Sequence, residues 1–277
     1  WRSDSKIEYG VMMMMNKLLK CYIPSRILRK LSIARSELNW YLSSKYWISR
    51  IRSSMLKNKH RGQRCFIIGN GPSLNNMDLS LLKDEVTFGM NRIYLMFPKL
   101  GWTTTYYVSV NNLVIEQCSH DIETLKTKKF ISWHTRDIIN FSSDMIFVCD
   151  PYDAPLGFSE NIQNRVWEGS TVTYVAMQIA YYMGFKQVIL IGVDHYFSTK
   201  GEPHNEVTSA GNDPNHFSPD YFGQGFRWHL PDLETSEQAY RLARHYYEKD
   251  GREILDATIG GQLNVFPKVN YQDLFRA

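Results

Sequence analysis

The chain has 277 residues, of which 43% are hydrophobic, and its net charge is +4. A chain of this size can bury a sizeable core, in one large domain or in one domain with an appendage. It holds no run of about 18 apolar residues and no signal-peptide core, so we expect no membrane-spanning segment. Its four cysteines are widely spaced without a C-x-x-C motif, which favours reduced thiols of a cytosolic protein over a disulfide framework or a zinc site.

Charge is unevenly distributed along the chain. Residues 1–62 hold 14 Lys and Arg against 3 Asp and Glu, whereas the remainder holds 18 against 25. Apolar residues at helical spacing, interrupted at Pro24, predict a basic amphipathic helical leader over residues 1–60. Basic residues interleaved with Trp40 and Trp47 are typical of a helix on an anionic membrane surface. The alternative is a basic helix pair packed on the body or in a homo-oligomer.

These features together predict a peripheral protein at the cytoplasmic face of the membrane. The basic leader would make the contact with the anionic lipid surface. We expect no nucleic acid partner, because no recognised nucleic-acid-binding module accompanies the positive charge.

From residue 61 onward, strand-like and helix-like segments alternate. Apolar runs predict strands at 65–68, 86–89, 105–110, 129–132, 145–148, 187–191 and 253–256. Helices are predicted over 170–183, ended by Gly184, and over 234–250. A long polar loop over 198–228 is expected to form a lid. The pattern predicts an α/β fold over 61–277, with a Rossmann-like, doubly wound, mostly parallel sheet and a small lid region.

The first predicted strand runs into a glycine-rich turn at residues 69–73, with the sequence Gly-Asn-Gly-Pro-Ser. A strand, a glycine turn and a helix N-terminus present free N–H groups and a helix dipole to one point, which predicts an anion site for nucleotide phosphates. The turn is neither a G-x-G-x-x-G fingerprint nor a Walker loop, since Leu74 replaces the third glycine and no Gly-Lys-Ser/Thr follows. An ordinary strand-to-turn connection is the alternative.

Polar residues recur after the predicted strands, at the edge of the sheet where such folds bind ligands. Asparagine can contact ribose, base edges or phosphate without adding charge, although a lone asparagine more often caps a turn. Their recurrence after three successive strands favours a nucleotide site. The positions are Asn70, Asn91 and Asn111 after the first three strands, Gly169, Ser170 and Thr171 before the long helix, and Asp194, His195 and Tyr196 after the strand at 187–191.

In this order, the motifs resemble those of bacterial sialyltransferases that use CMP-sialic acid. They resemble still more a broad bacterial and archaeal group that is named after 6-hydroxymethylpterin diphosphokinase and includes flagellin-glycosylation factors. The resemblance covers about residues 60–275 and rests on segments 69–74, 91–94, 110–113, 116–117, 169–170 and 192–196. It implies a Rossmann-like domain with a lid, a CMP-sugar donor, no metal and inversion at the anomeric carbon.

The resemblance also implies roles for single residues. His229 occupies the place of the family's general base, and Tyr196 that of a tyrosine bound to the leaving phosphate. The other matched positions belong to the donor or nucleotide site: Gly69, Asn70, Gly71 and Ser73 near phosphate and sugar, Asn91 and Asn111 at the nucleotide, Gly169, Ser170 and Thr171 near the donor carboxylate and cytidine, and Asp194 after its strand.

Two departures from the sialyltransferase pattern concern the sugar itself. An arginine expected before Ser170 is absent at Trp167-Glu168, although Arg165 is near. A second leaving-group tyrosine has no counterpart in 198–211, and Tyr221 is the remaining candidate.

The chemistry of transfer fits these residue types. An imidazole with a pKa near neutrality can accept the proton of an acceptor hydroxyl, and O–H groups can stabilise a phosphate leaving group without a metal. The sequence therefore predicts an inverting, metal-independent glycosyltransferase that needs no cofactor. It would move a nonulosonic or related acidic sugar, sialic acid-like or Kdo-like, from CMP to a glycan, lipid-linked or protein acceptor.

Two alternatives stand beside this prediction. A Mg²⁺-dependent pyrophosphokinase of the 6-hydroxymethylpterin diphosphokinase type would use Asp194, Asp213 and Asp232 as metal ligands. His195, His204 and His216 could join Asp194 around a transition metal, although their spacing is irregular. The second alternative is a non-catalytic, membrane-tethered nucleotide-binding scaffold, against which His229 and Tyr196 argue.

Overall fold

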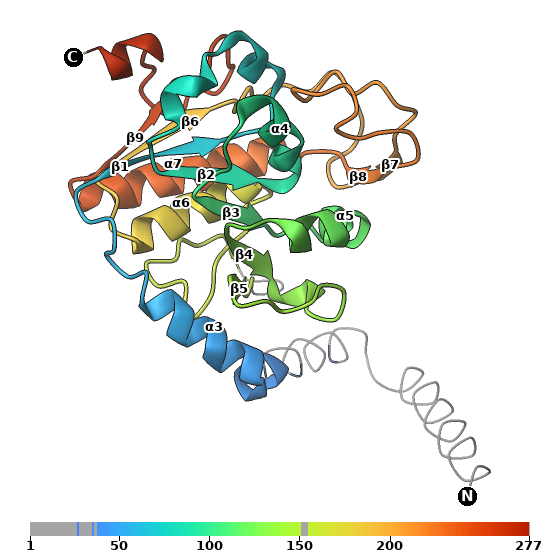
Figure 1. Ribbon diagram of the computed structural model, residues 1–277, viewed down its shortest axis with the longest axis vertical. Coiled ribbons are helices and arrows are strands. Elements are labelled where there is room, and N and C mark those ends of the chain that lie inside the picture. Colours follow the sequence, from blue (N-terminus) through green and yellow to red (C-terminus); the bar gives the residue numbers. More distant parts are fainter. Residues whose placement is uncertain (1–26, 28–34, 36–37, 151–154, 277) are drawn as a thin grey trace, which may run out of the picture. The chain divides into compact units, whose positions relative to one another are not determined.

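The computed structural model describes residues 27, 35, 38–150 and 155–276 (Figure 1). The chain divides into two compact units, Trp1–Tyr46 and Trp47–Ala277. The second unit contains the sheet and the candidate site. None of the helices in the described ranges is long and apolar enough to cross a membrane.

Seven strands of the second unit form one parallel sheet with the order β5-β4-β3-β2-β1-β6-β9. The chain steps outward from β1 to β5 and then returns to the opposite side of β1 with β6. This reversal between β1 and β6 is a topological switch point, where α/β sheets hold ligands beyond the carboxyl ends of their strands. The strands are β1 Arg64–Ile68, β2 Thr87–Met90, β3 Tyr106–Ser109, β4 Lys128–Ser132, β5 Met145–Val148, β6 Gln187–Ile191 and β9 Glu253–Asp256.

The strands are continuous apolar runs because other elements cover both faces of the sheet. On one face, Cys65 and Ile67 of β1 belong to the same hydrophobic cluster as residues of α6 (Val172–Tyr182) and α7 (Leu233–Lys249). On the other face, Phe66 stacks on Phe275 of the C-terminal 3₁₀ helix η5 (Gln272–Phe275). All residues of α6 from Thr173 onward are buried, so this helix lies in the centre of the core.

Shorter elements connect the strands. They are the 3₁₀ helices η1 Pro72–Asn76, η2 Leu79–Leu82, η3 Asn91–Met96 and η4 Trp133–Thr135, and the α-helices α4 Phe97–Leu100 and α5 Asn112–Thr124. Helix α5 was not predicted from the sequence, although its buried residues Leu113, Val114, Cys118 and Ile122 recur at helical spacing.

All seven predicted strands and both predicted helices of the body are confirmed, with ends within two residues of the expected ones. The predicted loop at 198–228 is wrong in part, because it contains a two-stranded antiparallel ribbon. Its strands are β7 (Glu206–Thr208) and β8 (Arg227–His229), with Glu206 opposite His229. Two three-residue strands on the surface lack the apolar run that identified the others.

Part of the predicted leader belongs to the second unit. In helix α3 (Ser44–Ser54), the Ser49 hydroxyl accepts a hydrogen bond from the Phe147 backbone N–H at 3.0 Å. The Arg52 guanidinium donates to the backbone oxygens of Ser142 and Met145. Residues from 47 onward therefore belong with the body, whereas the sequence placed the boundary at residue 60. Most of the leader lies outside the described residues, so its membrane contact stays a prediction.

Candidate functional site

A cavity of about 400 Å³ opens at the carboxyl ends of β1, β2, β3 and β6. Its size is that of a small-molecule site. Ten of the twelve predicted site residues line it: Gly69, Asn70, Gly71, Asn91, Asn111, Ser170, Thr171, Asp194, Tyr196 and His229. The other two, Ser73 and Gly169, support the wall from behind.

The turn after β1 packs directly against the loop after β6. The Gly69 N–H donates to the Ile191 backbone oxygen at 2.7 Å, and the Gly71 N–H donates to that of Gly192 at 2.9 Å. A Cβ atom on Gly69 would lie 2.1 Å from the Gly192 oxygen, and one on Gly71 would lie 1.7 Å from Asp194 Oδ2. Glycine is required at both positions because the two loops leave no room for a side chain.

The prediction that free backbone N–H groups of this turn bind an anion is wrong for three of these groups. The backbone N–H groups of Gly69 and Gly71 are already paired, and the Ser73 N–H donates to Asp194 Oδ1 at 3.1 Å. The turn then enters the five-residue 3₁₀ helix η1 and not an α-helix, so it lacks the expected macrodipole. These three N–H groups are therefore not available to a phosphate bound beside this turn.

Asp194 is the residue that holds the turn in place. Its Oδ2 accepts a second hydrogen bond from the Ser73 hydroxyl at 2.7 Å. Burial raises the pKa of the Asp194 carboxyl above its ordinary value, against the opposing effect of the hydrogen bonds from Ser73. Ser73 was predicted beside the donor phosphate, but its polar atoms face this carboxylate.

The three asparagines that follow the strands reach the same cavity. Asn91 Oδ1 accepts from the Ser109 hydroxyl at 3.1 Å, and Asn111 Oδ1 caps α5 by accepting from the Val114 N–H at 3.2 Å. Asn70 Nδ2 donates to the Met90 oxygen at 3.1 Å, while its Oδ1 is buried with no partner in the described part of the chain. An unpaired buried acceptor costs about 1–3 kcal/mol, which a ligand hydroxyl or N–H would offset.

The start of α6 forms a second wall. Gly169 and Ser170 have φ of 53° and 59°, and this left-handed turn leads into the cap residue Thr171, whose Oγ1 accepts from the Thr173 N–H. A Cβ on Gly169 would lie 2.6 Å from Ala239 Cβ, which explains the glycine there. The N-terminus of an 11-residue α-helix thus faces the cavity.

Glu168 is a lining residue that sequence reasoning missed. It stands where the arginine of the sialyltransferase pattern is absent, and its backbone N–H donates to Asp150 Oδ1 at 3.2 Å. Burial and the neighbouring Asp150 raise the pKa of the Glu168 carboxyl well above its ordinary value. This wall of the cavity therefore presents a carboxyl group where a guanidinium was expected. The absent arginine was visible in the sequence, but the burial of Glu168 was not.

Four histidines line the cavity, and three of them have a carboxylate partner. The pairs are His195 Nε2 with Glu237 at 3.1 Å, His204 Nε2 with Asp232 at 3.2 Å, and His216 Nδ1 with Asp213 at 2.7 Å. The fourth, His229, is exposed at the end of β8 and not in a loop as predicted. Its orientation comes from the β7–β8 ribbon.

The carboxylates proposed as metal ligands have separate partners. Asp194 binds Ser73, Asp213 binds His216, and Asp232 caps α7 at Thr235 and pairs with His204. Across the described ranges, no three His, Cys, Asp or Glu side chains gather in a group that could hold a metal ion. This donor set fits neither a protein-held Mg²⁺ site nor the transition-metal site considered above.

The lid is tied to the body by residues of two sequence motifs. The Gln117 amide donates to the Arg227 backbone oxygen and accepts from the Arg227 N–H, both at 2.8 Å, as a neighbouring strand would. Arg92 donates from its guanidinium to the backbone oxygens of Asp220 and Tyr221. The Tyr221 hydroxyl accepts from the Arg92 N–H at 3.3 Å, so the candidate for a second leaving-group tyrosine is engaged in lid anchoring.

Comparisons with known proteins identify the family of the chain. Among curated proteins, no sequence matches it. A solved structure similar to it is that of the MAf glycosyltransferase from Magnetospirillum magneticum AMB-1, with 15% sequence identity and a TM-score of 0.48. That match covers 83% of this chain and 39% of the other, so the chain spans less than half the length of that protein. The profile of one family matches residues 39–200, which is more than half of the chain: the protein belongs to the 6-hydroxymethylpterin diphosphokinase MptE-like family.

Proposed function

We propose that the protein is an inverting, metal-independent glycosyltransferase that uses a CMP-linked nonulosonic or related acidic sugar. The acceptor would be a glycan, a lipid-linked glycan or a protein. The observation that supports this proposal is the gathering of Asn70, Asn91, Asn111 and His229 around one cavity at the switch point of the sheet. Sites for nucleotides occupy this place in doubly wound folds.

The proposed roles follow from where each group lies. Asn91 and Asn111 border the part of the cavity beyond β2 and β3, where they would contact the nucleoside. Ser170, Thr171 and the N-terminus of α6 would face the donor's negative groups. Tyr196 lines the cavity, and its side chain is 51% exposed, so its hydroxyl is available to a bound phosphate.

His229 suits the part of a general base that works on an acceptor from solvent. It is exposed at the cavity rim, and its imidazole has no hydrogen bond or ion pair within the described ranges. In the proposed step, the imidazole takes the proton of the acceptor hydroxyl while that oxygen attacks the anomeric carbon. The bond to the phosphate oxygen breaks on the opposite face of the sugar, and its electron pair leaves with CMP.

A pyrophosphokinase is the second candidate, and the description of the family favours it. It would transfer diphosphate from ATP to an alcohol and would depend on Mg²⁺ bridging the phosphates. The separate partners of Asp194, Asp213 and Asp232 give this reaction no ready set of ligands.

A thermal-shift panel separates the candidates. A nucleotide that binds the native state raises the unfolding midpoint in proportion to ln(1 + [L]/Kd). We expect CMP and CDP to raise the midpoint with EDTA present, and UDP, GDP and AMP to have little effect. A response to ATP with Mg²⁺ alone would overturn the proposal in favour of the pyrophosphokinase. Stabilisation by CMP without turnover of any CMP-sugar would leave a nucleotide-binding scaffold.

A further inference from the structure

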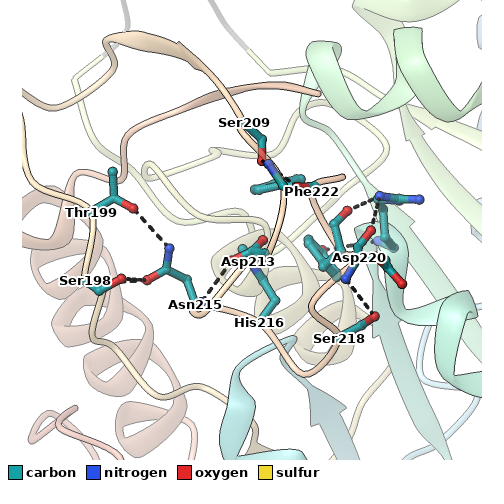
Figure 2. A network of polar contacts seen from close by, with 12 residues as sticks. Ser198, Thr199, Ser209, Asp213, Asn215, His216, Ser218, Asp220 and Phe222 are labelled. Atoms are coloured by element: carbon teal, nitrogen blue, oxygen red, sulfur yellow. Dashed lines mark hydrogen bonds and ion pairs between the residues drawn. The ribbon is translucent and has the colours of Figure 1, made fainter. Parts of the chain in front are cut away.

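One lid histidine is held more firmly than the others. His216 Nδ1 lies 2.7 Å from Asp213 Oδ2, and the two side chains are only 11% and 4% exposed. Asp213 Oδ1 in turn accepts from the Asn215 backbone N–H at 2.9 Å. Figure 2 shows Asp213, Asn215 and His216 together, with the Asn215 side chain reaching Ser198 and Thr199.

Contacts with two aromatic rings also fix the plane of the His216 imidazole. The ring of His216 stacks on that of Tyr221 with centroids 3.9 Å apart and an interplanar angle of 7°. Phe222 meets the same ring edge-on at 4.8 Å. Because Nδ1 is directed at Asp213, Nε2 is the ring nitrogen left for a ligand, and no protein partner for it occurs in the described part of the chain.

The next residue places His216 beside the glycine turn. The Phe217 N–H donates to the Asn70 backbone oxygen at 2.9 Å, and the Asn75 amide donates to the Phe217 oxygen at 2.8 Å. The lid therefore contacts Asn70 and Asn75, within and just after the turn at residues 69–73 where the sequence predicted a phosphate. His216 itself lines the cavity together with Asn70 and Ser170.

Among the side chains that line the cavity in the described ranges, the histidines are those that can carry a positive charge toward a phosphate. Its lining in the described ranges includes no Lys or Arg, and it includes the carboxyl groups of Glu168, Asp194 and Asp232. The N–H groups of Gly69, Gly71 and Ser73 are used within the protein. An imidazole that carries a proton on both nitrogens donates to two acceptors at once, here to the Asp213 carboxylate through Nδ1 and to a phosphate through Nε2.

We propose that His216, oriented by Asp213, binds the phosphate of the nucleotide and stabilises it as the leaving group. This inference rests on the proposed nucleotide-sugar transfer and supplies the second leaving-group contact that no tyrosine provides. In the step, the sugar–phosphate bond breaks and its electron pair goes to the phosphate oxygen. The imidazolium keeps its proton and holds the added charge by a charge-assisted N–H···O⁻ bond. The acceptor's proton goes to His229.

The test compares each nucleoside monophosphate with its nucleoside, by calorimetric titration of the full chain. CMP against cytidine is the first pair, and AMP against adenosine is the second. We expect CMP to bind wild type at least about tenfold tighter than cytidine, as a hydrogen bond to a charged group implies. The variant His216→Asn keeps an amide near Asp213 but lacks Nε2. It should lose most of this phosphate advantage while its cytidine affinity stays within about twofold, which a general loss of structure would not produce.

Two further variants support the comparison. His245→Asn is the matched control, because His245 lies on the exposed surface of α7 and is not among the residues that line the cavity. It should keep the phosphate advantage. Asp213→Asn should reduce the advantage in the same direction as His216→Asn, and it serves as the second variant if the first does not fold by circular dichroism.

The outcomes distinguish this inference from the proposed function. If His216→Asn still binds CMP more tightly than cytidine by the wild-type factor, the role of His216 is overturned and the CMP site is kept. If AMP binds more tightly than adenosine in a way that depends on His216, and CMP shows no such dependence, then the phosphate role of His216 is supported and the CMP donor is overturned. Failure of every nucleotide to bind wild type overturns both.

Discussion

The two halves of the cavity are held by different kinds of bond. On the body side, backbone groups fix the wall: the Gly69 and Gly71 N–H groups donate to the loop after β6, and no side chain fits between the loops. On the lid side, side chains fix it, as the distant Gln117 does for Arg227 and the neighbouring Asp213 does for His216. The first half is held by backbone hydrogen bonds and the second by hydrogen bonds from side chains.

The two halves contribute groups that suit different tasks, the body half for nucleoside binding and the lid half for proton transfer. The body half contributes amides and hydroxyls such as Asn91, Asn111 and Ser170, which suit recognition of a nucleoside. The lid half contributes His216 and His229, which can carry or accept a proton. Loss of a lid anchor should therefore impair chemistry before it impairs nucleoside binding, whereas damage to the glycine turn should affect the stability of the fold.

The largest expected effect is that of Gly71→Ala on the body half. The new Cβ would lie 1.7 Å from Asp194 Oδ2, so the loops must separate and the two hydrogen bonds from Ser73 must weaken. Hydrogen bonds to a charged group are worth about 1.5–3 kcal/mol each, and we expect the free energy of unfolding to fall by about 3 kcal/mol in urea titrations. Gly223→Ala is the control, since the nearest atom to its Cβ lies 3.9 Å away, and it should change stability by less than about 1 kcal/mol. Equal losses in the two variants would refute the close-approach argument.

A smaller effect is expected from Gln117→Leu on the lid half. The substitution leaves the Arg227 N–H and backbone oxygen without their partner, at a cost of about 1–3 kcal/mol for the closed lid. Amide hydrogen exchange in segment 226–230 should accelerate about tenfold or more, while exchange in β1 and β6 stays unchanged.

The neighbouring residue provides the control for this lid anchor. Glu116→Gln removes the ion pair between Glu116 and Arg227, which is 2.9 Å long and about half exposed on both sides. Exposed pairs of this kind contribute about 0–1 kcal/mol, so exchange in 226–230 should change little. If Glu116→Gln accelerated exchange as much as Gln117→Leu, the lid would be held by charge and not by the amide pairing.

The body of the fold was predictable because its signals are local. Apolar runs identified every strand of the parallel sheet, and most of the predicted residues that follow the strands line the cavity. The error at residues 69–73 had a specific cause: a sequence shows where N–H groups become available but not that Ile191, Gly192 and Asp194 will accept from them.

The lid was less predictable because its bonds join distant residues. Gln117 and Arg227 are 110 positions apart, and neither belongs to a periodic pattern that would pair them. The pairing of His216 with Asp213 is local, at three residues, but its meaning depends on Tyr221 and on the contact of Phe217 with Asn70. His229 was placed at the cavity by its motif, whereas the strand that carries it, β8, has only three residues.

The measurement that tests the central claim most directly is the release of CMP from CMP-N-acetylneuraminic acid in EDTA, with water or an added glycan as acceptor. We expect wild type to release CMP and His229→Ala to do so at least about 100-fold more slowly, with CMP affinity unchanged within about threefold. His245→Ala, on the exposed surface of α7, should behave as wild type. Turnover by His229→Ala at the wild-type rate would remove His229 from the mechanism, and the absence of CMP release by wild type from any CMP-sugar would contradict the transferase.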